Sequence, residues 1–257
     1  MTIEERLRSA IADECLAAID DVPKQATIEI ATLEALACCL GSERKLIQRR
    51  CAETFRTLHE RGIQVYRVLG STLRSDCARQ RWGAAFALSL IGHPDADLLP
   101  VLIESLGAPD GDVRWAAADI LQRLPDRSAA VRGLRALLRS PDPVQRKMAA
   151  YCLRDLHEPS AGLAQQVGAL LDDPDAGVRL AALSCLMQVS ADRASTAAAV
   201  LDCLQDPVAG VRRAAAAALG TLGVRSEPVI AALRAAVASD DASLHRAAER
   251  ALRLLGE

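Results

Sequence analysis

Asp-Pro-Asp-Ala-Gly-Val-Arg-Leu-Ala-Ala, residues Asp173–Ala182, is the most informative stretch of this 257-residue chain. A near copy, Asp-Pro-Val-Ala-Gly-Val-Arg-Arg-Ala-Ala, follows at Asp206–Ala215, and looser copies occur at Pro109–Ala117 and Ser140–Ala149. The arginine in this motif returns every 32 or 33 residues, and we call its six positions the arginine ladder: Arg49, Arg81, Arg114, Arg146, Arg179 and Arg212. His245 takes the seventh position. A fixed period of this size predicts a stack of repeats.

Each repeat is predicted to hold two antiparallel helices, which we call A and B in chain order. Proline, glycine and aspartate end the A helix, and Asp or Ser then caps the B helix, which carries the ladder arginine near its start. Counting from the arginine, offsets +2, +3, +6, +7 and +10 are nearly always apolar, which is helical spacing. The clearest A helices are expected at 97–106, 129–138, 163–171, 197–204 and 228–237.

These residues resemble the HEAT family, and most closely the short bacterial HEAT-like repeats first named in phycobilisome lyases. The Asp-Pro-Asp-x-x-Val-Arg-x-Ala-Ala pattern carries the resemblance over about residues 26–256, most clearly from Asp95 onward. It implies an all-α, right-handed solenoid, or superhelix, of about seven antiparallel helix pairs. We take residues 1–257 as one such domain, in which 1–22 form an N-terminal capping helix and 26–256 form the repeats.

Composition narrows the function classes. The chain is 51% hydrophobic but only 2% aromatic, which suits thin, alanine-rich helices that stack closely. The charged start and the lack of a long apolar run predict neither a signal peptide nor a membrane span, and so a cytoplasmic protein. Eight cysteines show no metal-ligand spacing. Cys51, Cys152 and Cys185 occupy apolar offsets and are interpreted as core residues.

Charge is unevenly distributed along the chain. Residues 1–42 carry a net charge of −5, residues 43–81 of +6 and residues 82–257 of −3. The basic block is confined to one part of the solenoid, so nucleic-acid binding is a second alternative rather than the favoured function. A further group of arginines lies on the last two B helices, where we expect a solvated cap first and a weak anionic contact second: Arg212, Arg213, Arg246, Arg250 and Arg253.

The arginine ladder is interpreted as structural, because residues common to every repeat usually serve the interfaces between repeats. The resemblance to the HEAT family implies that each arginine meets an aspartate from a neighbouring turn. Asp110, Asp142 and Asp175 each stand four residues before a ladder arginine and are the candidate partners. In the next repeat Val208 fills that position, and Asp206 is the nearest substitute.

Specific function is expected where the repeats differ. Offsets +1, +5 and +8 share one face of each B helix, outside the core offsets, and we call this face the B-helix stripe. Four of the six aromatic residues of the chain fall on it. The predicted partner-binding residues are Trp82, Phe86, Trp115, Asp119, Lys147, Tyr151, Arg154 and Arg50. Exposed aromatic clusters with polar edges are typical of binding hot spots. The alternative is that strong curvature packs the rings between layers.

Catalytic patterns are weak. The pairs His59-Glu60 and His157-Glu158 lie near the ends of B helices, whereas HEAT-type deoxyhypusine hydroxylases place their iron-binding His-Glu pairs at the starts. We therefore predict no metal, no cofactor and no catalytic residue. The favoured function is a non-enzymatic protein-interaction scaffold, adaptor or assembly chaperone that holds a peptide or helix in its concave groove. The first alternative is a bilin or tetrapyrrole lyase-like protein or cofactor carrier.

Overall fold

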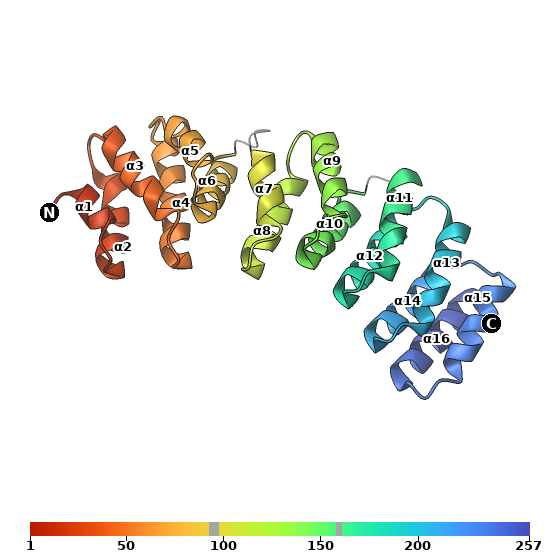
Figure 1. The fold of residues 1–257 in the computed structure, drawn as a ribbon. Coiled ribbons are helices and arrows are strands. Elements are labelled where there is room, and N and C mark those ends of the chain that lie inside the picture. The colour runs from red at the N-terminus through yellow and green to blue at the C-terminus, as the bar shows by residue number, and fades with distance from the viewer. Residues whose placement is uncertain (93–97, 158–160) are drawn as a thin grey trace. The chain divides into compact units, whose positions relative to one another are not determined.

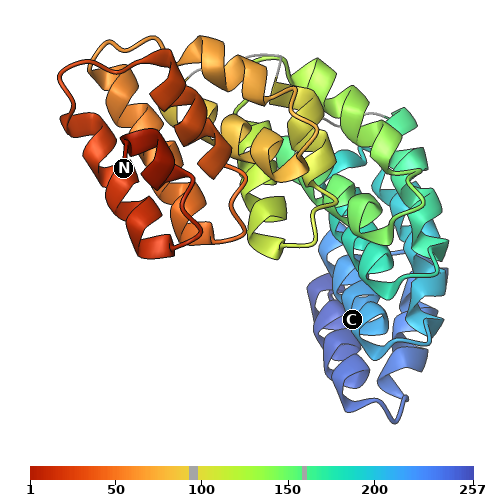
Figure 2. The same ribbon diagram turned by 60° about the vertical axis from the view of Figure 1, so that its left-hand side comes forward.

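The computed structural model describes residues 1–92, 98–157 and 161–257. Within these ranges the chain forms sixteen α-helices, α1 to α16, a few 3₁₀ turns and no strand, which confirms the predicted all-α solenoid. The predicted helix at 97–106 begins outside the described residues, and Asp95, His93 and Glu158 lie outside them as well. The helices fall into two compact units, residues 1–126 and 127–257, which we describe separately (Figures 1 and 2).

The first unit begins with α1 (Ile3–Leu7), α2 (Ala12–Asp21) and a 3₁₀ turn (Val22–Lys24). Three repeats follow, in which an A helix precedes a B helix: α3 (Ile30–Cys39) and α4 (Lys45–Glu60), α5 (Tyr66–Thr72) and α6 (Ala78–Ile91), α7 (Leu99–Ser105) and α8 (Gly111–Gln122). The B helices carry the first three ladder arginines.

The second unit holds four more repeats. They are formed by α9 (Arg127–Leu137) and α10 (Pro143–Leu156), α11 (Ala161–Gly168) and α12 (Ala176–Val189), α13 (Arg193–Leu201) and α14 (Ala209–Leu222), α15 (Glu227–Val237) and α16 (Ala242–Leu255). In this unit α10, α12, α14 and α16 lie side by side as one layer, and the A helices form the other (Figures 1 and 2).

The local sequence explains these elements. Three B helices begin with an aspartate whose side chain accepts a hydrogen bond from a backbone amide of the first turn: Asp110 in α8, Asp142 in α10 and Asp175 in α12. These bonds satisfy amide donors that have no partner within the helix. Alanine, leucine and valine at the predicted apolar offsets are buried, as Ala181 and Leu186 illustrate in α12. The core therefore lies between layers.

The N-terminal segment differs from the prediction, because it forms two helices rather than one capping helix. A capping box between Thr2 and Glu5 starts α1, and the helix ends at Leu7. The Leu7 carbonyl then accepts hydrogen bonds from the thiols of Cys15 at 3.3 Å and Cys39 at 3.2 Å. These contacts give α1 a partner in the next helices, and the chain turns back before α2 begins at Ala12.

Candidate functional site

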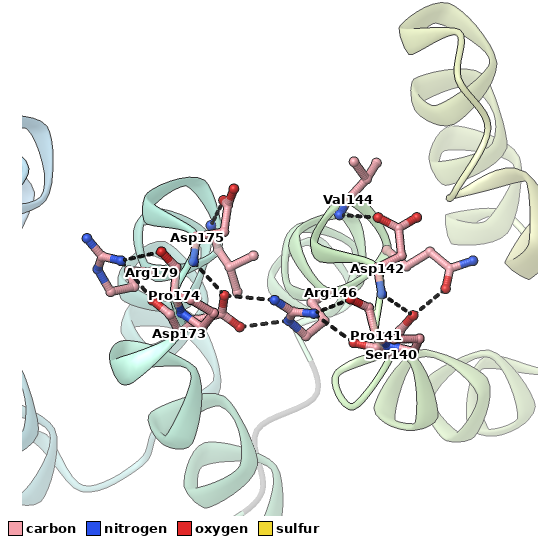
Figure 3. Close-up of polar contacts among 11 residues, drawn as sticks. Ser140, Pro141, Asp142, Val144, Arg146, Asp173, Pro174, Asp175 and Arg179 are labelled. Carbon is pink, nitrogen blue, oxygen red and sulfur yellow. Dashed lines mark hydrogen bonds and ion pairs between the residues drawn. The ribbon is translucent and has the colours of Figure 1, made fainter.

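The ladder arginines of the second unit join successive repeats through hydrogen bonds to an aspartate, which are paired for Arg146 and Arg179 and single for Arg212 with Asp241. Figure 3 shows the pair of Arg146 with Asp173. Arg146 donates from Nε and Nη2 to the carboxylate of Asp173 at 2.7 and 2.9 Å. Arg179 donates in the same way to Asp206 at 2.6 and 2.8 Å. Each pair connects a B helix to the turn that precedes the next B helix. Such bidentate, charge-assisted pairs are among the stronger polar contacts in proteins.

The third guanidinium nitrogen binds the turn of its own repeat. Arg179 Nη1 donates to the carbonyl oxygens of Asp173 at 2.7 Å and Pro174 at 3.2 Å. Arg146 and Arg212 make the equivalent two bonds in their repeats. Asp173 therefore accepts one ladder arginine through its carboxylate and the next through its carbonyl. Arginines and aspartates therefore alternate in one continuous chain of hydrogen bonds, which runs Arg146, Asp173, Arg179, Asp206, Arg212 and Asp241.

The partners predicted from the sequence need correction. Asp110 and Asp175 were expected to pair with a neighbouring arginine, but both cap a helix, and Asp142 does the same. The side chain of Asp175 turns toward the amides of the first turn of α12, and Arg146 of the preceding repeat binds Asp173, two positions earlier. Asp241 combines both roles, because it caps α16 and also accepts a hydrogen bond from Arg212. Asp206, expected as a substitute where Val208 occupies the usual position, is indeed a partner.

Burial and pairing set the charges of the ladder. Arg179, Asp173 and Asp206 are each only 8% exposed. Hydrogen bonds from Arg179 lower the pKa of Asp206 against the opposing effect of burial. Burial alone would raise the pKa of Asp173, but hydrogen bonds from Arg146 and from the Asp175 amide outweigh it, and the pKa is lowered. The groups are charged, paired and out of reach of a ligand, which supports a structural ladder.

The first unit builds its ladder differently. Arg81 forms two hydrogen bonds to Glu104 and a third, of 2.6 Å, to the Ser75 carbonyl. Pairing with Glu104 raises the pKa of Arg81. Arg49 is exposed, and its guanidinium lies 3.9 Å from Asp112. We did not anticipate Glu104 as a partner. The sequence signal was Ala108, which stands six residues before Arg114, where Asp173 stands before Arg179.

Trp82 is the main correction to the predicted binding face. We expected its indole to face solvent, but it is only 7% exposed and packs beside Phe86, with ring centroids 5.8 Å apart. The cause is the next residue, Gly83. A Cβ at this position would stand 2.6 Å from the carbonyl oxygen of Leu40, so the backbone of α6 presses directly against the end of α3. This close approach draws α6 inward, and the rings pack between layers.

A salt bridge closes over the recessed helix α6. Lys45 at the start of α4 reaches Asp110 at 2.7 Å and Asp112 at 2.8 Å, both near the start of α8. These hydrogen bonds raise the pKa of Lys45. The three residues, together with Trp82 and Phe86, line a cavity of about 70 Å³. We call the contact of Lys45 with the two aspartates the Lys45 bridge.

Trp115 keeps the exposure that we predicted. Its side chain is 52% exposed on α8, and Asp119 on the same stripe is exposed one turn later. Arg50 is also exposed and lies 3.5 Å from Asp20. The stripe of the first unit therefore offers one large indole with charged groups on neighbouring turns, and its other two aromatic rings are part of the packing.

The stripe of the second unit carries the remaining predicted residues. Tyr151 is half-buried in α10, and the guanidinium of Arg154 lies 5.1 Å from the centre of its ring. Arg154 also donates to Asp155 at 2.6 Å, and this hydrogen bond raises the pKa of Arg154. A further bond, of 3.2 Å, joins it to Ser184. Lys147 is half-buried beside the start of α12. Aromatic and cationic groups thus meet on this helix as well.

No group of three or more metal-binding side chains occurs in the described ranges. His59 lies beside Tyr66, whose hydroxyl is 3.4 Å from Nε2, and His157 ends α10 with Nδ1 2.7 Å from the Asp155 carbonyl. Both histidines have ordinary helix-end surroundings. Burial raises the pKa of the Cys152 and Cys185 thiols to about 12, which suits the core position predicted for them.

Within residues 1–92, 98–157 and 161–257, none of the helices combines the length and the apolarity that a bilayer span requires.

Comparisons with known proteins agree with this geometry. A profile of HEAT repeats matches residues 99–167 and 164–253. The Escherichia coli protein YibA superposes with a TM-score of 0.58 at 16% identity, over 98% of this chain and 91% of that one. An engineered protein superposes with a TM-score of 0.51 at 20% identity, over 98% of this chain and 77% of that one. These two likenesses concern the fold alone, and neither they nor the HEAT profile point to phycobilisome lyases in particular. None of the curated proteins compared with the chain matches it.

Proposed function

The chain belongs to the HEAT-repeat family, and we propose that it is a non-enzymatic protein-interaction scaffold whose partner binds the B-helix stripe of residues 1–126 at Trp115. The observation that carries this proposal is the exposure of Trp115, a large ring at 52% exposure in a chain that is only 2% aromatic. Rigid aromatic area with polar edges is what interface hot spots use.

The surroundings of Trp115 provide those edges. Asp112 precedes it by three residues on α8 and holds the Lys45 bridge, and Asp119 follows four residues later. Residues three and four apart are neighbours on a helix surface, so both carboxylates flank the indole. A partner segment with an apolar anchor and basic or amide groups beside it would suit this surface.

At the aromatic residues Trp82 and Phe86, the tetrapyrrole alternative receives less support. A planar pigment needs a pocket of roughly 300 Å³ or more, as drug-sized ligands generally do. The cavity beside Trp82 and Phe86 has about 70 Å³. It is also covered by the Lys45 bridge.

Nucleic-acid binding is disfavoured by the pairing of the basic block at 43–81. Several of its cations already contact carboxylates within the first unit. These pairs are Arg50 with Asp20, Arg79 with Glu43, Arg81 with Glu104, and Lys45 with Asp110 and Asp112. Phosphate binding at these cations would compete with contacts that the chain already makes.

The test compares two single variants of matched chemistry. Trp115→Ala removes the exposed ring, and Ile30→Ala removes another apolar side chain of the same unit, which is 49% exposed on the A helix α3 and so outside the stripe. Partners recovered from host extract by the wild type are purified and titrated against each variant. Trp115→Ala should weaken binding by about 30-fold or more, the effect of losing a hot spot of roughly 2 kcal/mol. Ile30→Ala should stay within about 2-fold of wild type. Equal affinity of the two variants would overturn the proposal, provided both melt like the wild type.

A further inference from the structure

The B-helix stripe of the last two repeats forms a groove that is separate from the Trp115 surface. It lies between α14 and α16 and has a volume of about 610 Å³. Its lining extends from Arg213 to Thr221 on α14 and from Ser243 to Leu254 on α16. At a rise of about 1.5 Å per residue, these segments span about 12 and 17 Å, which matches two to three turns of a bound helix.

The floor of the groove is apolar and shallow. Ala214, Ala217 and Ala247 line it, and Leu254 stands at one end with 61% of its surface exposed. The hollow exists because these side chains are small. Larger residues at the same stripe positions, such as Tyr151 in α10, would fill it. An exposed leucine beside an alanine floor is an apolar surface that a partner side chain can cover.

The rim of the groove is strongly basic. Arg213, Arg246 and Arg250 line it, and all three are exposed. In the part of the chain that the structure describes, none of them has a carboxylate within 4.0 Å. Other arginines of these two repeats do have one: Arg212 with Asp241, and Arg225 and Arg234 with Glu257.

Two of the nearby acids contact other groups. Glu249 lies 3.4 Å from His245, and Asp241 accepts Arg212 and caps α16. Ser243, which also lines the groove, donates its hydroxyl to Asp241. The three rim arginines therefore face solvent, and within the described residues no carboxylate neutralises them by a direct contact.

From this combination we infer that the groove binds an acidic amphipathic helix of a protein partner. Carboxylates of that helix pair with Arg213, Arg246 and Arg250, while its apolar residues cover the alanine floor and Leu254. Charge complementarity selects the acidic occupant. The apolar floor selects a helix over a phosphate or a nucleic-acid backbone, because those ligands have nothing to place there.

The probe is a fluorescent 16-residue helical peptide with glutamate along one face and leucine along the other. It is titrated against the full chain by anisotropy at two salt concentrations. Its controls are a peptide of the same composition in scrambled order, poly-L-glutamate, and phosphatidylserine vesicles. We expect the amphipathic peptide to bind best, and its affinity to fall as salt rises.

Two variants test the groove itself. R246E/R250E reverses the rim charge and should weaken the affinity for the peptide by about 10-fold or more. Each exposed ion pair contributes roughly 2- to 5-fold to affinity, and charge reversal adds repulsion. R139E/R193E makes the same change in net charge at exposed arginines outside the groove and should stay within about 2-fold. Ala217→Trp fills the floor without a change of charge and should weaken peptide binding as well.

Three outcomes would overturn the inference. The first is no binding of the amphipathic peptide, or equal binding of the scrambled peptide, poly-L-glutamate or vesicles. The second is equal loss in R246E/R250E and R139E/R193E. The third is self-association of the chain, measured by sedimentation, that R246E/R250E abolishes, since the occupant would then be a second copy. Trp115 lies outside this groove, so failure here leaves the proposed function standing.

Discussion

Replacing Asp206 by alanine should destabilise the second unit far more than the loss of an ordinary surface ion pair. The substitution removes both hydrogen bonds from Arg179 and the acceptor for the Val208 amide, which lies 2.8 Å from the carboxylate. Arg179 then remains only 8% exposed with two of its donors unpaired. Breaking a buried pair by removing one partner costs about 3–5 kcal/mol, since the other charge stays in a poorly solvated place.

Asp119→Ala is the matched control. Asp119 also pairs with an arginine, Arg123, at 2.5 Å, but the two side chains are 70% and 61% exposed. Exposed pairs of this kind contribute below about 1 kcal/mol. The two substitutions delete the same side chain and the same type of ion pair. They differ in burial and in the second arginine bond and the Val208 amide bond that only Asp206 accepts. Any large difference in stability therefore reports the environment of the ladder.

Urea unfolding followed by circular dichroism gives the free energy of unfolding, and hydrogen exchange locates the effect. Exchange should rise in α13 and α14, with α1 to α8 as an internal reference, because repeats interact mainly with their neighbours. A double variant, Arg179→Met with Asp206→Leu, should recover much of the loss, since no unpaired charge is left. If Asp206→Ala and Asp119→Ala differ by less than about 1 kcal/mol, the buried ladder is not what holds these repeats together.

Three other outcomes are expected. Because the folded pKa of Asp206 is lowered, its stabilising effect is complete above the unfolded pKa of about 4 and is lost as the pH falls through the folded value. Wild-type melting temperatures should therefore drop on acidification more steeply than those of Asp206→Ala. Gly83→Ala should cost about 1–3 kcal/mol in urea unfolding, since its Cβ would meet backbone at 2.6 Å, whereas Gly70→Ala, with open space, should be neutral or stabilising; equal effects would contradict the close approach. Lys45→Met should increase acrylamide quenching of Trp82 fluorescence, measured in a Trp115→Phe background, and unchanged quenching would show that the Lys45 bridge does not cover that ring.

Much of the fold could be predicted from local patterns. The B helices start near the expected caps because Asp142 and Asp175 satisfy amides within their own turns. The apolar offsets are buried because helical geometry alone puts them on one face. The N-terminal segment was predicted less well, since α1 ends at Leu7, whose carbonyl accepts hydrogen bonds from thiols of two other helices that local periodicity does not report.

The candidate site was harder to predict. Trp82 and Trp115 occupy the same offset in neighbouring repeats, yet one is 7% and the other 52% exposed. The difference depends on how deeply α6 lies between its neighbours, and Gly83 was the one local hint. The groove between α14 and α16 was visible as a group of arginines, but its alanine floor only has meaning once the two helices are placed side by side.

By itself, the sequence determined the repeat, the helix pairs, the caps and the apolar faces, because these features depend on residues within one turn or one helix. Only the tertiary structure decided which aspartate each ladder arginine binds, which tryptophan faces water and which arginines border a hollow. Those properties depend on the spacing between helices, and that spacing is set by contacts such as the one between Gly83 and Leu40, more than forty positions apart in the chain.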